Sequence, residues 1–270
     1  MTLDLLAMAP PFLAAARTGL GVWLALASAH WLAGAEVFGE GGPSPWRHMA
    51  GRGMLGTVRR RMTVRGLRRW MAAQMILAVL LPFAQSPALA GACLLVALAS
   101  HAAFLILAGE HGASGAGKIG LIGLAGTLIG TIALARGDAA LLLAGCLVSG
   151  GQLLICYGVA GVSKLLRSEW RTGDELQGVM AHGTWGAPWA AALVRPRMVA
   201  VSASWALMLG EALFPLALLL PEPWLIAALA AMFAFHLATA VVMRLSLFPW
   251  AFVATYPAVL LGRVVREALG

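Results

Sequence analysis

Long apolar stretches separated by short polar connections dominate the chain. Several approach or exceed about 20 residues, the length that an α-helix needs to cross the hydrocarbon core of a bilayer. We distinguish about eight such segments, at residues 12–34, 70–85, 88–109, 118–135, 139–165, 198–220, 223–243 and 247–262. Strand-like alternation is scarce, and lipid leaves backbone polar groups without partners. The pattern therefore predicts an all-α, polytopic transmembrane helix bundle, with residues 1–270 forming a single domain.

Composition supports an integral membrane protein surrounded by a lipid bilayer. Hydrophobic residues make up 61% of the chain and charged residues 11%, whereas a soluble domain carries roughly 25% charged residues. The apolar segments fill most of the sequence, so little is left for a soluble domain.

The positive charge is concentrated in one connection. Residues 46–70 hold eight arginines and no acidic residue, within a net charge of +8 for the chain. Basic connections mark the cytoplasmic side of membrane proteins and attract anionic lipid headgroups. We therefore predict a basic cytoplasmic loop at about 46–69 and do not expect nucleic-acid binding. With eight spans, the polar connection at about 166–197 lies on the same side as this loop, and the N-terminus lies on the other side.

The motif search excludes several enzyme classes. The three cysteines, Cys93, Cys146 and Cys156, form no CxxC pair, which disfavours a dithiol redox enzyme. The chain has no HExxH, no GxSxG and no phosphate-binding glycine loop, and we expect no metal site. Small residues at four-residue spacing, such as Gly126 and Gly130, predict a close approach between two helices.

Titratable side chains within the apolar segments are the candidate functional residues, because such groups are costly in a membrane and usually face an interior cavity. Glu211 and His236 lie in the middle of their segments, and His101 also lies deep. Tyr157 and Lys164 are seven residues apart and so share one helical face. A lone carboxylate at such depth needs a partner, and Lys164 is one of the few cations available to Glu211. A lysine that merely reaches from a helix end to the interface remains the alternative for Lys164.

Two stretches resemble the vitamin K-dependent gamma-carboxylase and its bacterial relatives, the horizontally transferred transmembrane (HTTM) domain proteins. The first is "YGVAGVSKLLRSEWRTGDEL", residues 157–176, with an aromatic residue, Ala-Gly, Lys-Leu, a tryptophan (Trp170) and a glycine (Gly173). The second is "FAFHLATAVVMRLSLFPWAFVATYP", residues 233–257, with its Phe-His pair. The resemblance covers the C-terminal half of the chain.

The resemblance implies a quinol-linked modifying enzyme of the carboxylase or epoxidase type, in the inner (cytoplasmic) membrane of a bacterium. It assigns Lys164 as the base that deprotonates a reduced, vitamin K-like quinone. Reaction of the quinone anion with O2 gives a strong base that takes a proton from the final substrate, a peptide or a small molecule, to which CO2 is added. A desolvated lysine next to a lipid-soluble quinol is suited to general-base chemistry. Tyr157, Glu211 and His236 are further catalytic candidates.

Trp170, His101 and His111 are the candidates for cofactor binding. His111, beside Glu110, is a local candidate for the upstream histidine that the carboxylase uses. Where the carboxylase has a second lysine, just before the catalytic one, this chain has Ser163. Two other functions stay open: a non-catalytic membrane partner of another protein, and a small-molecule carrier resembling the DoxX-like proteins, which share an A-G-x-x-K-L signature.

Overall fold

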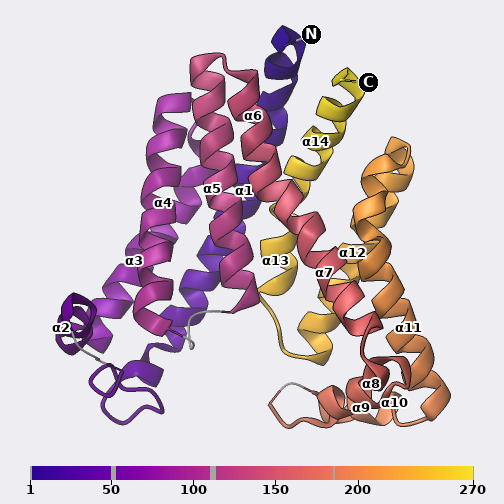
Figure 1. The fold of residues 1–270 in the computed structure, drawn as a ribbon. Helices are drawn as coiled ribbons and strands as arrows, with labels where there is room; N and C mark the ends of the chain where they lie inside the picture. Colours follow the sequence, from indigo (N-terminus) through magenta and orange to yellow (C-terminus); the bar gives the residue numbers. More distant parts are fainter. Residues whose placement is uncertain (1, 50–52, 110–113, 185, 270) are drawn as a thin grey trace.

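The computed structural model describes residues 2–49, 53–109, 114–184 and 186–269, and in these ranges the chain is a bundle of helices without strands (Figure 1). The N-terminal part contains α1 (Thr2–Ala33), η1 (Ala35–Phe38), α2 (Gly53–Arg61), α3 (Val64–Leu80), η2 (Leu81–Phe83), α4 (Pro87–Ala108) and α5 (Gly115–Arg136). A second set of long helices follows: α6 (Ala139–Cys146), the π-turn η4 (Leu147–Gly151), α7 (Gln152–Leu165), α11 (Arg197–Leu213), η5 (Phe214–Leu219), α12 (Glu222–Val242), α13 (Phe248–Val253) and α14 (Tyr256–Leu269). Three short helices lie between α7 and α11: α8 (Ser168–Arg171), α9 (Asp174–Ala181) and α10 (Pro188–Leu193).

The predicted membrane bundle is confirmed. Among the described residues, seven segments are long and apolar enough to span a membrane. The remaining predicted span corresponds to α3, which has 17 residues and packs along α1. Both termini lie at one end of the bundle, whereas α2 and the short helices α8–α10 lie at the other (Figure 1). This arrangement agrees with eight passes and places the basic loop and the 166–197 connection at the same end.

Several predicted boundaries differ from the observed ones. The first helix extends to Thr2 rather than beginning near residue 12, and it continues through Pro10 and Pro11. The second begins at Val64 instead of residue 70, because the hydroxyl of Thr63 caps it by accepting a hydrogen bond from the Gly66 amide at 3.0 Å. The last part of the predicted basic loop is therefore the first turns of α3, and another part of it is α2.

Glycines set how closely the helices of the bundle approach. A Cβ atom at Gly126 would lie 2.7 Å from the carbonyl oxygen of Gly145, and one at Gly145 would lie 2.8 Å from the Gly130 nitrogen. Such contacts are too short for any side chain, so α5 and α6 pack backbone to backbone. The close approach predicted from Gly126 and Gly130 is thus confirmed.

Candidate functional site

A cavity of about 750 Å³ lies between the N-terminal and C-terminal helices, lined by residues of α5, α7, α11, α12 and α13 and of the short helices α8 and α9. Its walls are mostly apolar. The polar or titratable side chains around it are Lys118, Gln152, Cys156, Tyr157, Lys164, Glu211, His236 and Thr239. A volume of this size, with few polar groups in an apolar lining, is typical of sites for small organic molecules.

Lys164 and Glu211 form an ion pair at this cavity, from α7 and α11. The side chains are 20% and 9% exposed, so the pair is largely removed from solvent. The Lys164 ammonium also lies 5.5 Å from the centre of the Trp170 ring, within the range of a cation–π contact. The partner expected for Glu211 is therefore the one observed.

Gly161 brings the two charged side chains together. A Cβ atom there would lie 2.2 Å from the backbone nitrogen of Ala212, the residue after Glu211. Only glycine permits this approach, so the Ala-Gly preceding "VSKL" sets the distance between α7 and α11. Gly158, one turn earlier, lies against Pro215 in the same way.

Tyr157 and His236 form the second polar pair of the cavity. The tyrosine oxygen and His236 Nε2 lie 2.5 Å apart and share a hydrogen bond between α7 and α12. Both residues are buried, and aromatic rings surround them: Phe214 lies 4.6 Å from Tyr157 and Phe252 lies 4.0 Å from His236, between ring centres. His236 Nδ1 has no hydrogen-bond partner among the described residues.

The connection after α7 closes one end of the cavity. Trp170 of α8 and Leu176, Val179 and Met180 of α9 line it. Gly173 joins these two helices with φ of 80°, a left-handed conformation that suits glycine, and its α-carbon lies against the backbone of Ala200 in α11. The spacing of lysine, tryptophan and glycine that marks this stretch thus corresponds to a cap over the cavity.

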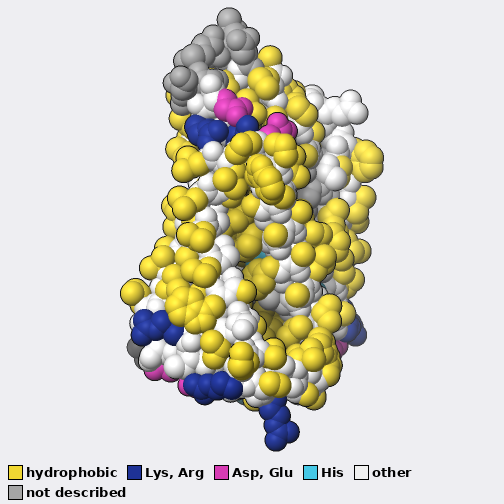
Figure 2. Space-filling model, turned by 90° about the vertical axis from the view of Figure 1, so that its right-hand side faces the viewer, with side chains coloured by type: hydrophobic (Ala, Val, Ile, Leu, Met, Phe, Trp, Pro, Cys, Tyr) yellow, Lys and Arg dark blue, Asp and Glu magenta, His cyan; other side chains and the backbone are white. Residues whose placement is uncertain are grey.

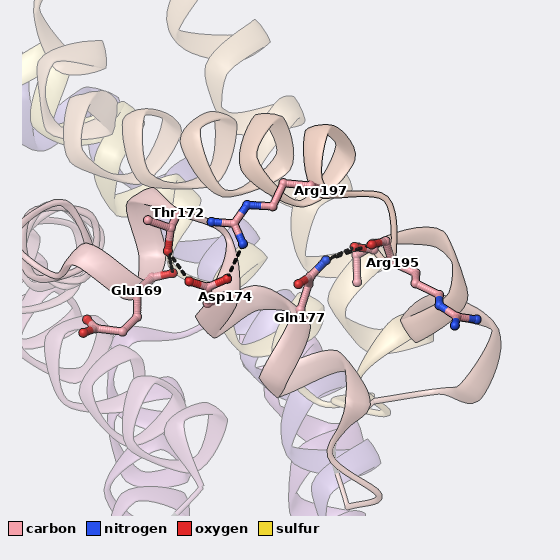
Figure 3. Close-up of polar contacts among 7 residues, drawn as sticks. Glu169, Thr172, Asp174, Gln177, Arg195 and Arg197 are labelled. Carbon is pink, nitrogen blue, oxygen red and sulfur yellow. Dashed lines mark hydrogen bonds and ion pairs between the residues drawn. The ribbon is translucent and has the colours of Figure 1, made fainter.

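Polar contacts hold the cap against the start of α11 (Figure 3). The Asp174 carboxylate accepts hydrogen bonds from Arg197 at 2.8 Å and from the Thr172 hydroxyl at 2.6 Å. The Gln177 amide donates to the carbonyl oxygens of Val194 and Arg195, at 2.9 and 3.0 Å. These residues fix the cap from outside and do not line the cavity.

The remaining cofactor-binding candidates lie elsewhere. His101 of α4 is buried on the other side of α5, where its Nε2 lies 3.2 Å from the Gly117 carbonyl oxygen and its ring meets Trp23 edge to face at 4.8 Å. The structure does not bring it to the cavity. His111 and Glu110 fall outside the described residues. Gln152, a polar candidate within the apolar segments, does line the cavity, and so does Lys118, which sequence reasoning did not select.

One lipid-facing side of the bundle, which carries α11 and α12, is largely apolar and hollowed (Figure 2). A histidine side chain is visible at the bottom of the hollow.

Residues 145–261 match the model of the HTTM domain family. This stretch is similar to the HTTM domain. The matched range runs from the end of α6 into α14 and contains both polar pairs of the cavity, so the expected resemblance is confirmed over these residues. No curated protein and no solved structure matches the chain.

Proposed function

We propose that this protein is a membrane enzyme that uses a reduced quinone, and that the Lys164–Glu211 pair removes a proton from it. The observation that carries the proposal is the meeting of two buried polar pairs, Lys164–Glu211 and Tyr157–His236, in one apolar cavity. A purely structural ion pair has no need of a cavity beside it.

The residues present suit a quinol. The volume of about 750 Å³ accommodates a bicyclic ring system. The phenylalanines beside His236 offer faces for stacking. When bound, a reduced quinone supplies an acidic hydroxyl and, after deprotonation, reactivity toward O2.

The ion pair is able to accept the proton of the quinol hydroxyl. The positive charge that the pair gains balances the negative charge left on the quinol oxygen, so the cavity gains no net charge. Lys164 and Glu211 together hold one proton that either Nζ or Oε2 is able to carry. When the shared proton is on Glu211, the neutral Lys164 amine takes a second proton from the bound hydroxyl, which leaves an ammonium and a neutral carboxylic acid. The Lys164 ammonium then faces the oxygen that lost the proton and stabilises its charge, which a low-dielectric cavity makes more effective.

Tyr157 and His236 are proposed to hold the opposite side of the ring. Their shared hydrogen bond fixes both side chains at the cavity wall. Trp170 covers the ammonium from the cap and helps to exclude water. The final substrate, a peptide or a small molecule, then reacts at the cytoplasmic end, where the cap lies.

The test is oxygen consumption by the protein in liposomes supplied with a chemically reduced naphthoquinone. Lys164→Arg keeps the positive charge but removes the base, because a guanidinium does not deprotonate in proteins. We expect wild-type protein to consume oxygen above the protein-free rate, and Lys164→Arg to lower that rate by about 10²–10⁴-fold. Gel filtration checks that the variant is folded. Full activity of Lys164→Arg, or no activity of the wild type, contradicts the proposal.

A further inference from the structure

A basic hollow of about 560 Å³ lies at the start of α3, at the end of the bundle opposite the two termini (Figure 1). It is lined by Thr63, Val64, Arg65, Gly66 and Arg69. None of these residues lines the main cavity, so the basic hollow is a separate feature of the N-terminal part of the chain.

The two arginines of the basic hollow are not neutralised by the protein. Arg68, the neighbour of Arg69, pairs with Glu36 at 3.0 Å, whereas neither Arg65 nor Arg69 forms an ion pair with a residue that the structure describes. Both side chains are exposed, and they are four residues apart, so they project from the same face of α3. Guanidinium groups bind phosphate through paired N–H donors. A phosphate in the hollow is therefore able to contact both arginines.

Contacts with backbone groups fix the position of this hollow. Arg59 of α2 donates from Nε to the Leu107 carbonyl oxygen at 3.0 Å and from Nη2 to that of Ile106 at 3.1 Å, which fastens α2 to the end of α4. The Thr63 hydroxyl then caps α3 by accepting from the Gly66 amide at 3.0 Å. The first turn of α3, which carries Arg65, is thus held in place before any ligand binds.

The face of α3 that carries the two arginines continues as a lipid-facing surface. At about 100° per residue, Ile76 and Leu80 lie within roughly 60° of Arg65 and Arg69 around the helix axis. Their side chains are 63% and 51% exposed, so in a bilayer they contact acyl chains. Ile76 lies about 10 Å beyond Arg69 along the helix. A phosphate in the hollow and acyl chains along Ile76 and Leu80 are therefore close enough to belong to one lipid molecule.

The preceding helix indicates the depth of the hollow in the membrane. Met54, Leu55 and Val58 of α2 are exposed, and the last turn of this helix consists of arginines. A helix with exposed apolar side chains next to basic ones is typical of the membrane interface. This places the hollow, which follows α2 directly, at the level of the lipid headgroups.

We propose that the basic hollow binds the headgroup phosphate of an anionic phospholipid, whose acyl chains lie along Ile76 and Leu80 in the leaflet at this end of the bundle. A zwitterionic phospholipid carries its own cation beside the phosphate, whereas an anionic one leaves the phosphate charge to Arg65 and Arg69. The site therefore selects anionic lipids. This inference does not rest on the proposed quinone site.

The test compares the binding of a fluorescent phosphatidylglycerol with that of the matching phosphatidylcholine, using the purified protein in detergent micelles. The variant Arg65→Gln/Arg69→Gln removes both guanidinium groups from the hollow. Arg167→Gln/Arg195→Gln is the matched control, because these two arginines are exposed at the same end of the bundle and line neither the hollow nor the main cavity. A diazirine on an acyl chain of phosphatidylglycerol shows where the lipid lies on the wild-type protein, without any substitution.

We expect the wild type to bind phosphatidylglycerol more tightly than phosphatidylcholine. Each arginine lost should weaken phosphatidylglycerol binding about fivefold, so Arg65→Gln/Arg69→Gln should bind it roughly 25-fold more weakly, and the control variant should bind it as the wild type does. The diazirine should label α3 between residues 72 and 80. Inorganic phosphate should displace no more lipid than chloride at equal ionic strength.

Four results would each overturn the proposal. The first is equal affinity of the wild type and Arg65→Gln/Arg69→Gln for phosphatidylglycerol, and the second is an equal loss in the control variant, which would show a general effect of charge. The third is labelling confined to other helices. The fourth is displacement of the lipid by inorganic phosphate, which would show a site for free anions instead.

Discussion

The buried ion pair predicts a strong energetic coupling between Lys164 and Glu211. Their side chains are 20% and 9% exposed, and the wall around them is apolar. Removing one partner of such a pair leaves an uncompensated charge, at a cost of about 3–5 kcal/mol, whereas replacing both by apolar residues is often nearly neutral. We therefore expect Lys164→Met and Glu211→Leu each to destabilise the protein by about 3 kcal/mol or more. The double variant should recover most of that loss.

Equilibrium unfolding in mixed micelles, followed by circular dichroism, measures these differences. The exposed pair Asp174–Arg197, with side chains 53% and 61% exposed, is the internal control. Its coupling energy in the same cycle should be only about 0.2–1 kcal/mol. Additivity of Lys164→Met and Glu211→Leu within about 0.5 kcal/mol would refute the claim that the two charges depend on each other.

Three further predictions concern a close helix contact, a buried hydrogen bond and the membrane topology. Gly161→Val should lower thermal stability and weaken quinone binding, because its Cβ has no room against the backbone of α11; unchanged melting and binding would contradict this. Tyr157→Phe removes the hydrogen bond to His236 and should cost about 1–3 kcal/mol in unfolding free energy, since the ring nitrogen loses a buried partner. Cysteines placed at His48 and at His182, both exposed at the same end of the bundle, should be labelled by an impermeant maleimide from the same side, the cytoplasm; labelling from opposite sides would disprove the eight-pass arrangement.

The membrane bundle was predictable because the cost of burying backbone in lipid leaves long apolar helices as the main solution. The ends of the individual helices were less predictable from the sequence. Pro10 and Pro11 are poor helix signals, yet α1 continues through them. The arginines of α3 are poor signals of a membrane span, so the start of that helix was assigned to the loop. The π-turn before α7 has no distinct sequence pattern.

Parts of the candidate site were also predictable. Tyr157 and Lys164 are seven residues apart on one helix, so their common face followed from helix geometry. The charge of Glu211 required a cation, and few were available. The Tyr157–His236 contact spans 79 positions and depends on how α7 and α12 cross, which no local pattern encodes.

The most direct measurement is the quinone content of the purified protein. Lipid extracts of wild-type protein, quantified by mass spectrometry, should contain a quinone bound to the protein. Ala160→Trp fills the cavity from α7 and should lose it, whereas Val159→Trp, which faces lipid on the same helix, should keep it. Absence of quinone from the wild type, or equal amounts in all three proteins, would contradict the proposal that this cavity is a quinone site.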